Sequence, residues 1–138
     1  MVKTIVRDEA FLSVPSEPAE KGDVVIGQDL MDTLRANADR CVGLSGNMIG
    51  ARKKVIIVNL DGGLLNLVMF NPEIVWKEGP YLAQEGCLSL DGIREVLRYE
   101  LIEVEFHDLL WNRKRMKFSG WTAEIVQHEM DHLAGILI

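Results

Sequence analysis

An α+β protein is the fold class that the sequence predicts, on three observations. Apolar residues recur at helical spacing between residues 27 and 39, β-rich segments fill the middle of the chain, and a second helical pattern runs from Thr122 to Leu133. Helix, several strands and helix in this order are typical of the α+β class. The 138 residues suit one hydrophobic core, so we expect a single domain over residues 1–138.

The first part of the chain predicts a loop, a helix and an irregular segment. Residues 13–23 (SVPSEPAEKGD) contain two prolines and several turn-forming residues, which indicates a loop. Residues 27–39 are predicted to form an amphipathic helix. Its apolar positions are Leu30, Met31, Leu34 and Ala38. Between residues 43 and 50, three glycines and one asparagine interrupt the helical pattern.

Two β-rich segments predict a hairpin. VIIVNL (55–60) and LNLVMFN (65–71) flank the sequence DGG, which is a strong turn signal. Between residues 102 and 106, apolar side chains alternate with glutamates, and this alternation predicts a strand with one face in water.

The last third of the chain predicts a turn, a short strand and a helix. Residues 108–113 have the composition of a hairpin turn, and a short strand is expected near residues 116–118. The final helix is expected to begin at Thr122, to run through Leu133 and to stop at Gly135.

The charge composition disfavours a nucleic-acid partner. The formal net charge is −6, with 21 acidic and 15 basic residues, whereas domains that bind nucleic acid usually present a basic face. One local group of basic residues is interpreted as a solvated turn and strand. It consists of Arg113, Lys114, Arg115 and Lys117.

Apolar runs and cysteine usage indicate where the protein works. No apolar run approaches the length needed to span a bilayer, and the first residues, MVKTIVRDEAFL, lack the apolar core of a secretion signal. A secreted disulfide scaffold of this size would carry more cysteines than Cys41 and Cys87. We therefore expect a cytoplasmic protein without a membrane partner.

The sequence QHEMDH (127–132) predicts a metal site on the final helix. If this segment is helical, His128 and His132 lie about 40° from eclipsed and about 6 Å apart along the axis, so both imidazoles can reach one divalent ion. Glu129 points about 100° away and could take a proton from water beside the ion. The alternative is a pair of surface histidines, which the apolar neighbours Ile125, Val126 and Leu133 disfavour, since they indicate a buried face.

A catalytic metal site usually takes three protein ligands, so a third is needed. Cys87 lies in QEGCLSLDG (84–92), where Gly86 permits a tight backbone and the thiolate is a strong soft ligand. His107 and the carboxylates are the other candidates, although His107 is expected to face solvent at a strand end. A buried structural thiol is the alternative for Cys87.

At these residues the chain resembles the peptide deformylases. EGCLS (85–89) and QHEMDH (127–132) are similar to the second and third motifs of that family. CVGLSGNM (41–48) is an altered counterpart of the first motif, G-x-G-L-A-A-x-Q. The resemblance covers essentially the whole chain, and it implies small antiparallel or mixed β-sheets around a central C-terminal helix that carries HExxH.

The resemblance implies a metal-dependent hydrolase that removes the formyl group from formyl-methionine at the N-terminus of nascent peptides. Cys87, His128 and His132 would bind one divalent ion, ferrous iron in the natural protein with zinc or nickel as substitutes. Glu129 would be the general acid/base, and the backbone N–H of Leu88 would stabilise developing negative charge. The partners would be formylated nascent peptides at the ribosome, and we expect a monomer.

Weaker parts of the resemblance concern the substrate. Glu85 would pair with Arg98 and, together with Gly86, would hold the cysteine loop beside the substrate. A second group would pair with the substrate backbone, namely Val42, Gly43 and Leu44. A third group would line the methionine pocket, namely Trp121, Glu124 and Ile125. Simple packing or a surface ion pair is the alternative for each, and for Trp121 we weigh core packing equally.

The first motif departs from the family pattern where the chemistry needs a donor. Met48 stands at the glutamine position, and a thioether has no hydrogen to donate. Loss of one such donor typically costs about 10²–10³ in rate. Asn47 is the obvious substitute if Gly46 lets the backbone turn it toward the cavity.

These departures leave other functions open. A protein that keeps the metal could bind N-formyl or N-acyl peptide termini with little turnover. A related metal-dependent amidase could reuse the same scaffold.

Overall fold

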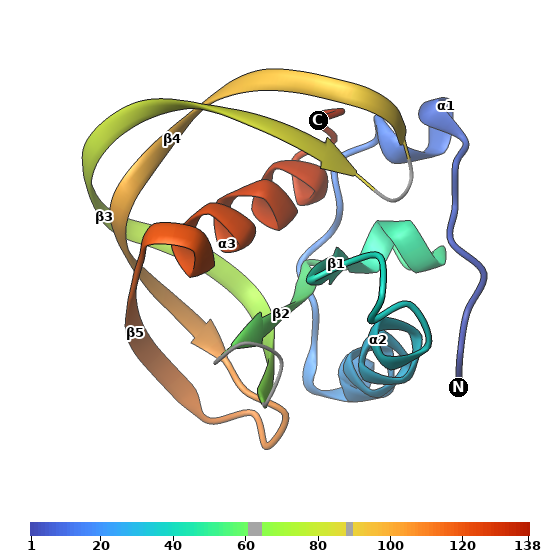
Figure 1. Cartoon of the computed structure of the whole chain (residues 1–138). Coiled ribbons are helices and arrows are strands. Elements are labelled where there is room, and N and C mark those ends of the chain that lie inside the picture. The colour runs from blue at the N-terminus through green and yellow to red at the C-terminus, as the bar shows by residue number, and fades with distance from the viewer. Residues whose placement is uncertain (61–64, 88–89) are drawn as a thin grey trace.

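The computed structural model describes residues 1–60, 65–87 and 90–138, and it confirms the α+β class (Figure 1). One five-stranded sheet runs in the order β1-β2-β3-β4-β5, with every neighbouring pair antiparallel. The several small sheets that the resemblance implied are one sheet, bent around the C-terminal helix. In chain order the elements are α1 (Glu9–Leu12), η1 (Lys21–Asp23), α2 (Val24–Ala36), β1 (Gly43–Ser45), η2 (Gly46–Ile49), β2 (Val55–Leu60), β3 (Leu65–Cys87), β4 (Leu90–His107), β5 (Arg113–Ser119) and α3 (Gly120–Leu133).

Strand β2 is buried on both faces. Val55 and Ile57 belong to an apolar cluster that includes side chains of α2. Ile56 and Val58 belong to a second cluster, which includes side chains of α3. Because successive side chains point to opposite faces, a strand covered on both sides needs an unbroken apolar run, here VIIV. Figure 1 shows α2 and α3 on either side of β2, so helix, sheet and helix form three layers.

The predicted hairpin between residues 55–60 and 65–71 is confirmed. Val58 lies opposite Leu67, and Leu60 lies opposite Leu65. The DGG turn predicted at residues 61–63 lies outside the described residues.

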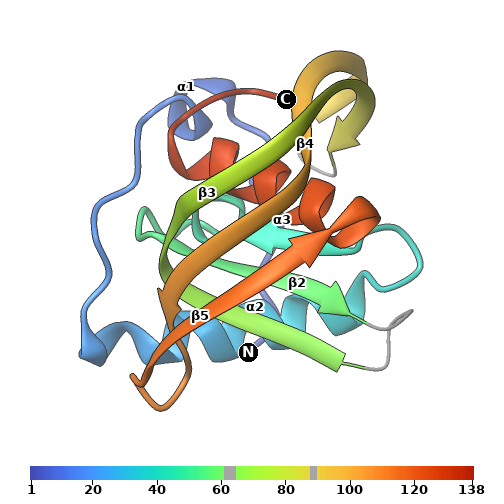
Figure 2. The same ribbon diagram turned by 90° about the vertical axis from the view of Figure 1, so that its left-hand side faces the viewer.

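Strands β3 and β4 are much longer than the predicted segments and form a curved arm across α3 (Figure 2). Their pairing is irregular at three places, between Phe70 and Glu73, Ile74 and Trp76, and Glu85 and Cys87. Such bulges bend a strand and increase its twist. The curvature returns the end of β3, and with it Cys87, to the side of α3.

The alternating segment at residues 102–106 forms the predicted strand with one wet face. Its apolar side chains are buried in the cluster beneath α3. Its glutamates face β5, where Arg113 pairs with Glu105 at 2.8 Å and Arg115 pairs with Glu103 at 2.9 Å. The basic residues of β5 are thus partly neutralised by these carboxylates.

Both predicted helices are present with shifted boundaries. Helix α2 begins and ends three residues earlier than predicted, because it follows the 3₁₀ turn η1 and ends at Asn37, whose side chain donates to the carbonyl of Thr33 at 2.8 Å. Helix α3 begins two residues before Thr122. Gly135 follows it with φ +79°, and a Cβ there would lie 2.4 Å from the carbonyl of Ser13. Only glycine fits this close approach.

The segment predicted as loop, residues 13–23, is irregular except for the 3₁₀ turn η1. Helix α1 and the 3₁₀ turn η2 were not predicted from the sequence. Within residues 1–60, 65–87 and 90–138, no helix combines the length and the apolar character that crossing a bilayer requires.

Candidate metal centre

Three side chains with metal-binding atoms meet between the end of β3 and helix α3. Cys87 is the last residue of β3, and His128 and His132 lie one turn apart on α3. One ligand atom from each residue lies within 4.8 Å of the other two. The two imidazole centroids are 4.4 Å apart, as expected for positions i and i+4 on one helix face.

The other candidate histidine lies elsewhere. His107 ends β4, and its ring stacks on Trp111 with centroids 4.7 Å apart. Within the part of the chain that the structure describes, Cys87, His128 and His132 are the one group placed closely enough to share an ion.

A buried chain of ion pairs holds His128 in place. Its Nδ1 lies 2.7 Å from Oε1 of Glu85. Two N–H groups of Arg98 donate to that carboxylate at 2.7 and 2.8 Å. A third N–H group of Arg98 donates to Asp131 at 2.6 Å. Burial opposes ionisation of Glu85, but the hydrogen bonds from His128 and Arg98 prevail and lower its pKa to about 2. The pairing of Glu85 with Arg98 expected from the sequence is confirmed.

His132 is fixed through both ring nitrogens. Nε2 lies 3.0 Å from the backbone carbonyl oxygen of Ile138. Nδ1 lies 3.2 Å from Oε1 of Glu129. Glu129 is 4% exposed, and its carboxylate sits beside the histidines rather than among the three grouped ligand atoms.

The three grouped side chains compete for protons. Burial disfavours a thiolate, but hydrogen bonds from His128 and His132 prevail and lower the pKa of Cys87 to about 6. Burial also disfavours both imidazolium ions, yet hydrogen bonds with Cys87 and a carboxylate raise the pKa of His128 to about 9 and that of His132 to about 11. One thiolate and two imidazoles fit a divalent transition-metal ion, whose binding displaces such protons.

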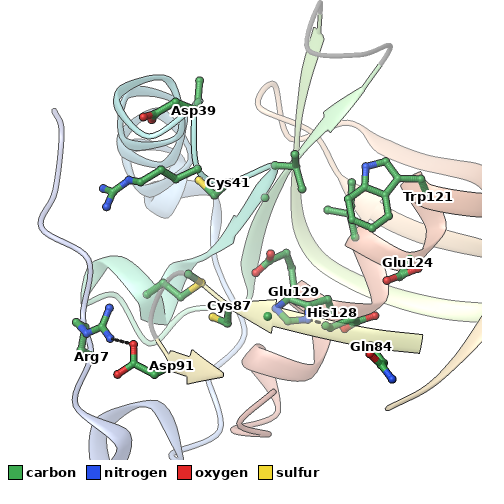
Figure 3. Close-up of a pocket in the computed structure, with 18 residues that line it drawn as sticks. Arg7, Asp39, Cys41, Gln84, Cys87, Asp91, Trp121, Glu124, His128 and Glu129 are labelled. Atoms are coloured by element: carbon green, nitrogen blue, oxygen red, sulfur yellow. Dashed lines mark hydrogen bonds and ion pairs between the residues drawn. The ribbon is translucent and has the colours of Figure 1, made fainter. Parts of the chain in front are cut away.

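A cavity of about 660 Å³ opens beside these residues, which is within the range of small-ligand sites. Figure 3 shows Cys87, His128 and Glu129 facing the cavity, with Trp121 and Glu124 farther along α3. Trp121 is 63% exposed, so core packing is the wrong interpretation for it, and its ring forms part of the rim. The other lining residues that the sequence singled out are Val42, Gly43, Met48, Glu85, Gly86 and Ile125.

The β1 segment forms one wall of the cavity, and it is one of the two edge strands of the sheet. At Gly43, a Cβ would lie 2.9 Å from the Ile125 side chain and 3.0 Å from Oε2 of Glu129. Glycine at this position therefore leaves room for the carboxylate. Leu44 does not line the cavity, because its side chain is fully buried in the core beside α2.

The altered first motif presents Met48, and not Asn47, to the cavity. Met48 lines the cavity with 2% of its surface exposed. The side-chain amide of Asn47 donates instead to the backbone carbonyl of His132 at 2.8 Å. The expectation that Asn47 supplies the missing donor is therefore wrong, because the 3₁₀ turn η2 directs it toward α3. Leu88, the other expected donor, lies outside the described residues.

Sequence reasoning missed three polar residues that support the site. Gln127 links α3 to β4 by two hydrogen bonds. Its amide donates to the carbonyl of Tyr99 at 2.8 Å and accepts from the N–H of Tyr99 at 2.9 Å. Tyr81 donates to Glu124 at 3.0 Å, and Asp131 receives Arg98. Gln127 and Asp131 could have been found from the sequence, because both are polar residues of QHEMDH on a helix with apolar neighbours.

Comparisons with known proteins agree with this geometry. The family model described as polypeptide deformylase matches residues 2–138. A peptide deformylase from Clostridium beijerinckii is 51% identical over 138 residues, which is 100% of both chains. One from Thermomicrobium roseum is 40% identical over 121 residues, covering 81% of this chain and 67% of the relative.

Solved structures of similar proteins share the fold. A class I type b peptide deformylase from Acinetobacter baumannii, bound to Met-Ala-Ser, superposes with a TM-score of 0.89 at 28% identity, covering 99% of this chain and 97% of that one. A probable peptide deformylase from Synechococcus phage S-SSM7 has a TM-score of 0.85 at 34% identity, with the same coverage. With matches along its whole length and a Cys/His/His group beside a cavity, this chain belongs to the peptide deformylases, metal-dependent hydrolases that remove the N-formyl group from nascent peptides.

Proposed function

We propose that Cys87, His128 and His132 hold the metal ion of this deformylase and that Glu129 is its general acid/base. The observation that carries the proposal is the grouping of the three ligand atoms within 4.8 Å of one another. Glu129 adjoins this group at 3.2 Å from His132 and lines the same cavity.

The roles follow from the chemistry of amide hydrolysis. An ion bound there would supply Lewis-acid polarisation of the formyl carbonyl and would make water a better nucleophile. Glu129 takes the proton from the attacking water and then delivers it to the nitrogen of the leaving amine. The backbone N–H of Leu88 is proposed to stabilise the negative charge that develops on the formyl oxygen. Arg98 and Glu85 keep the imidazole of His128 oriented, as partners of metal-bound histidines generally do.

The substrate is proposed to lie along β1 with its first side chain between β1 and α3. Val42 directly precedes β1, and Gly43 and Leu44 belong to it. This strand is at an edge of the sheet, where its backbone groups suit an extended peptide. Trp121 and Ile125 offer apolar surface for the methionine side chain. Glu124 lies on the same wall, and Gly86 adjoins the ligand Cys87. The similar structure bound to Met-Ala-Ser is consistent with a formylated methionyl peptide as substrate.

Ferrous iron is the proposed natural metal, with zinc and nickel as substitutes. The thiolate and two imidazoles are compatible with all three ions. The reducing cytoplasm is the proposed compartment, since oxidation of Cys87 would remove a ligand. We further propose that the protein works as a monomer on nascent peptides at the ribosome, which sedimentation with and without ribosomes would test.

Formate release from formyl-Met-Ala-Ser tests the proposed roles. Nickel-loaded wild type should turn over this peptide, and Glu129→Gln should lower kcat by about 10²–10⁴-fold while it retains one metal ion per chain. Wild-type kcat in the metal-loaded variant would contradict the role of Glu129. Acetyl-Met-Ala-Ser is the matched control substrate, and comparable hydrolysis of it would indicate a broader amidase.

A binding protein with little turnover is the second candidate, and Met48 is the observation that favours it. The thioether lines the cavity where the family pattern has an amide donor. Tight binding of the formyl peptide together with background formate release from wild type would support this second function.

A further inference from the structure

The first motif has an amide side chain at residue 47, one position before the glutamine of the family pattern. This amide forms a hydrogen bond with α3. Asn47 is fully buried. Its Nδ2 donates to the backbone carbonyl of His132 at 2.8 Å, and its Oδ1 accepts from the hydroxyl of Ser45 at 2.6 Å. Ser45, which departs from the family pattern, and Asn47, which occupies its variable position, thus form one hydrogen-bonded pair. It reaches the residue that is the second histidine of QHEMDH.

The carbonyl of His132 needs such a partner because it lies in the last turn of α3. Carbonyls at a helix C-terminus lack the N–H of a following turn. The N–H of Gly135 reaches this carbonyl at 3.0 Å, and Asn47 supplies a second donor from η2. A carbonyl held from two directions fixes the backbone of His132, and with it the direction in which the imidazole leaves the helix.

Ser45 acts on the same residue from the side of the ring. Its Oγ lies 3.5 Å from Nδ1 of His132 while its proton is engaged by Asn47. Ser45 is fully buried and His132 is 5% exposed. The adjoining gap, lined by Asn47, Met48, Cys87 and His132, measures about 10 Å³, which is at the lower limit for one water molecule. Bulk water therefore cannot replace these hydrogen bonds.

We propose that Ser45 and Asn47 are positioning residues that set the geometry of His132 as a metal ligand. The inference rests on the proposed ligand set Cys87, His128 and His132. In this chain the polar groups of the first motif would then orient a metal ligand, whereas the amide of the family pattern donates to the negative charge that develops on the substrate. Partners that orient metal ligands typically change metal affinity by about 10–100-fold when removed.

Retention of the metal by Asn47→Ala tests the inference. Nickel-loaded proteins are mixed with a chelator at fixed pH, and the rate of metal transfer is measured together with Tm. We expect Asn47→Ala to release nickel about 10–100-fold faster than wild type. The cobalt-loaded variant should show shifted and broadened d–d absorption bands, because the imidazole no longer holds one orientation.

Asn37→Ala is the matched control. Asn37 is also buried, and its amide also donates to a carbonyl at a helix C-terminus, that of Thr33 in α2 at 2.8 Å. This variant should lower Tm and leave nickel transfer at the wild-type rate. Nickel release from Asn47→Ala no faster than from Asn37→Ala would overturn the inference.

Ser45→Ala carries the test if Asn47→Ala does not fold. Alanine is the residue of the family pattern at position 45, so it fits the space. Faster nickel release than in Asn37→Ala supports the pair as positioning residues, and equal release overturns it. A wild-type protein that binds no metal would instead refute the proposed function, so the two failures are distinguishable.

Discussion

Helices α2 and α3 lie on opposite faces of the same sheet and bury different kinds of side chain. They are similar in length, with 13 and 14 residues. The buried residues of α2 are Gly27, Leu30, Thr33 and Leu34. Those of α3 include four polar side chains, Gln127, His128, Glu129 and His132.

The difference shows which helix is built for chemistry. Burying a polar group is costly unless it finds a hydrogen-bond partner. Each buried polar side chain of α3 has a hydrogen-bond partner. Gln127 pairs with Tyr99, His128 with Glu85, Glu129 with His132, and His132 also with Ile138. Helix α2 needs no comparable network because its contribution to the core is apolar, apart from Thr33. Substitutions on α2 should therefore change stability, whereas substitutions at the metal face of α3 should change chemistry.

Loss of the thiolate should have the largest effect. Cys87→Ala leaves two imidazoles as ligands, and we expect the purified variant to hold no stoichiometric metal and to release no formate. Metal analysis and a formate assay measure both. A variant that kept one ion per chain would contradict the ligand assignment.

Truncating a buried side chain in the α2 layer should affect only stability. Leu30 is fully buried in the apolar cluster that α2 shares with the sheet. Leu30→Ala should lower the free energy of unfolding by about 2–5 kcal/mol, as measured by urea denaturation. Turnover per bound metal should equal that of wild type at a temperature where both are folded. A large loss of kcat would contradict the view that α2 contributes to stability alone.

The wall opposite α3 should respond to a restored donor. Met48→Gln puts a side-chain amide where the thioether lines the cavity, and we expect kcat to rise by up to about 10²-fold. Steady-state kinetics on the formyl peptide measure it. An unchanged kcat would mean that another group already serves this position.

The smallest expected effect concerns the polar face of α3 that does not meet the metal. Gln127→Ala leaves the N–H and carbonyl of Tyr99 without their side-chain partner. The free energy of unfolding should fall by about 1–3 kcal/mol, with metal content unchanged. Loss of metal would show that the hydrogen bonds between Gln127 and Tyr99 also position the ligands.

The sequence was most informative where periodicity is strict. Unbroken apolar residues gave β2, alternation gave the second half of β4, and the i, i+4 histidines lie on one face as expected. The long arm of β3 and β4 was missed because Pro72, Gly79 and Pro80 interrupt its pattern and much of it is exposed. Bulges there depend on pairing across the sheet, which no local pattern encodes.

Within the site, local spacing predicted the helix-borne residues and failed for the first motif. The direction of Asn47 depends on the 3₁₀ turn η2 and on a carbonyl 85 residues away in sequence. For Trp121 the sequence leaves both the methionine pocket and core packing open, because an aromatic side chain suits either. Its place at the start of α3 puts it on the cavity rim.

X-ray absorption spectroscopy of the zinc-loaded protein tests the ligand set most directly. We predict one sulfur at about 2.3 Å and two imidazole nitrogens at about 2.0–2.1 Å from the metal. A spectrum without a sulfur neighbour, in a protein that binds one zinc ion per chain, would contradict the assignment of Cys87 and the mechanism built on it.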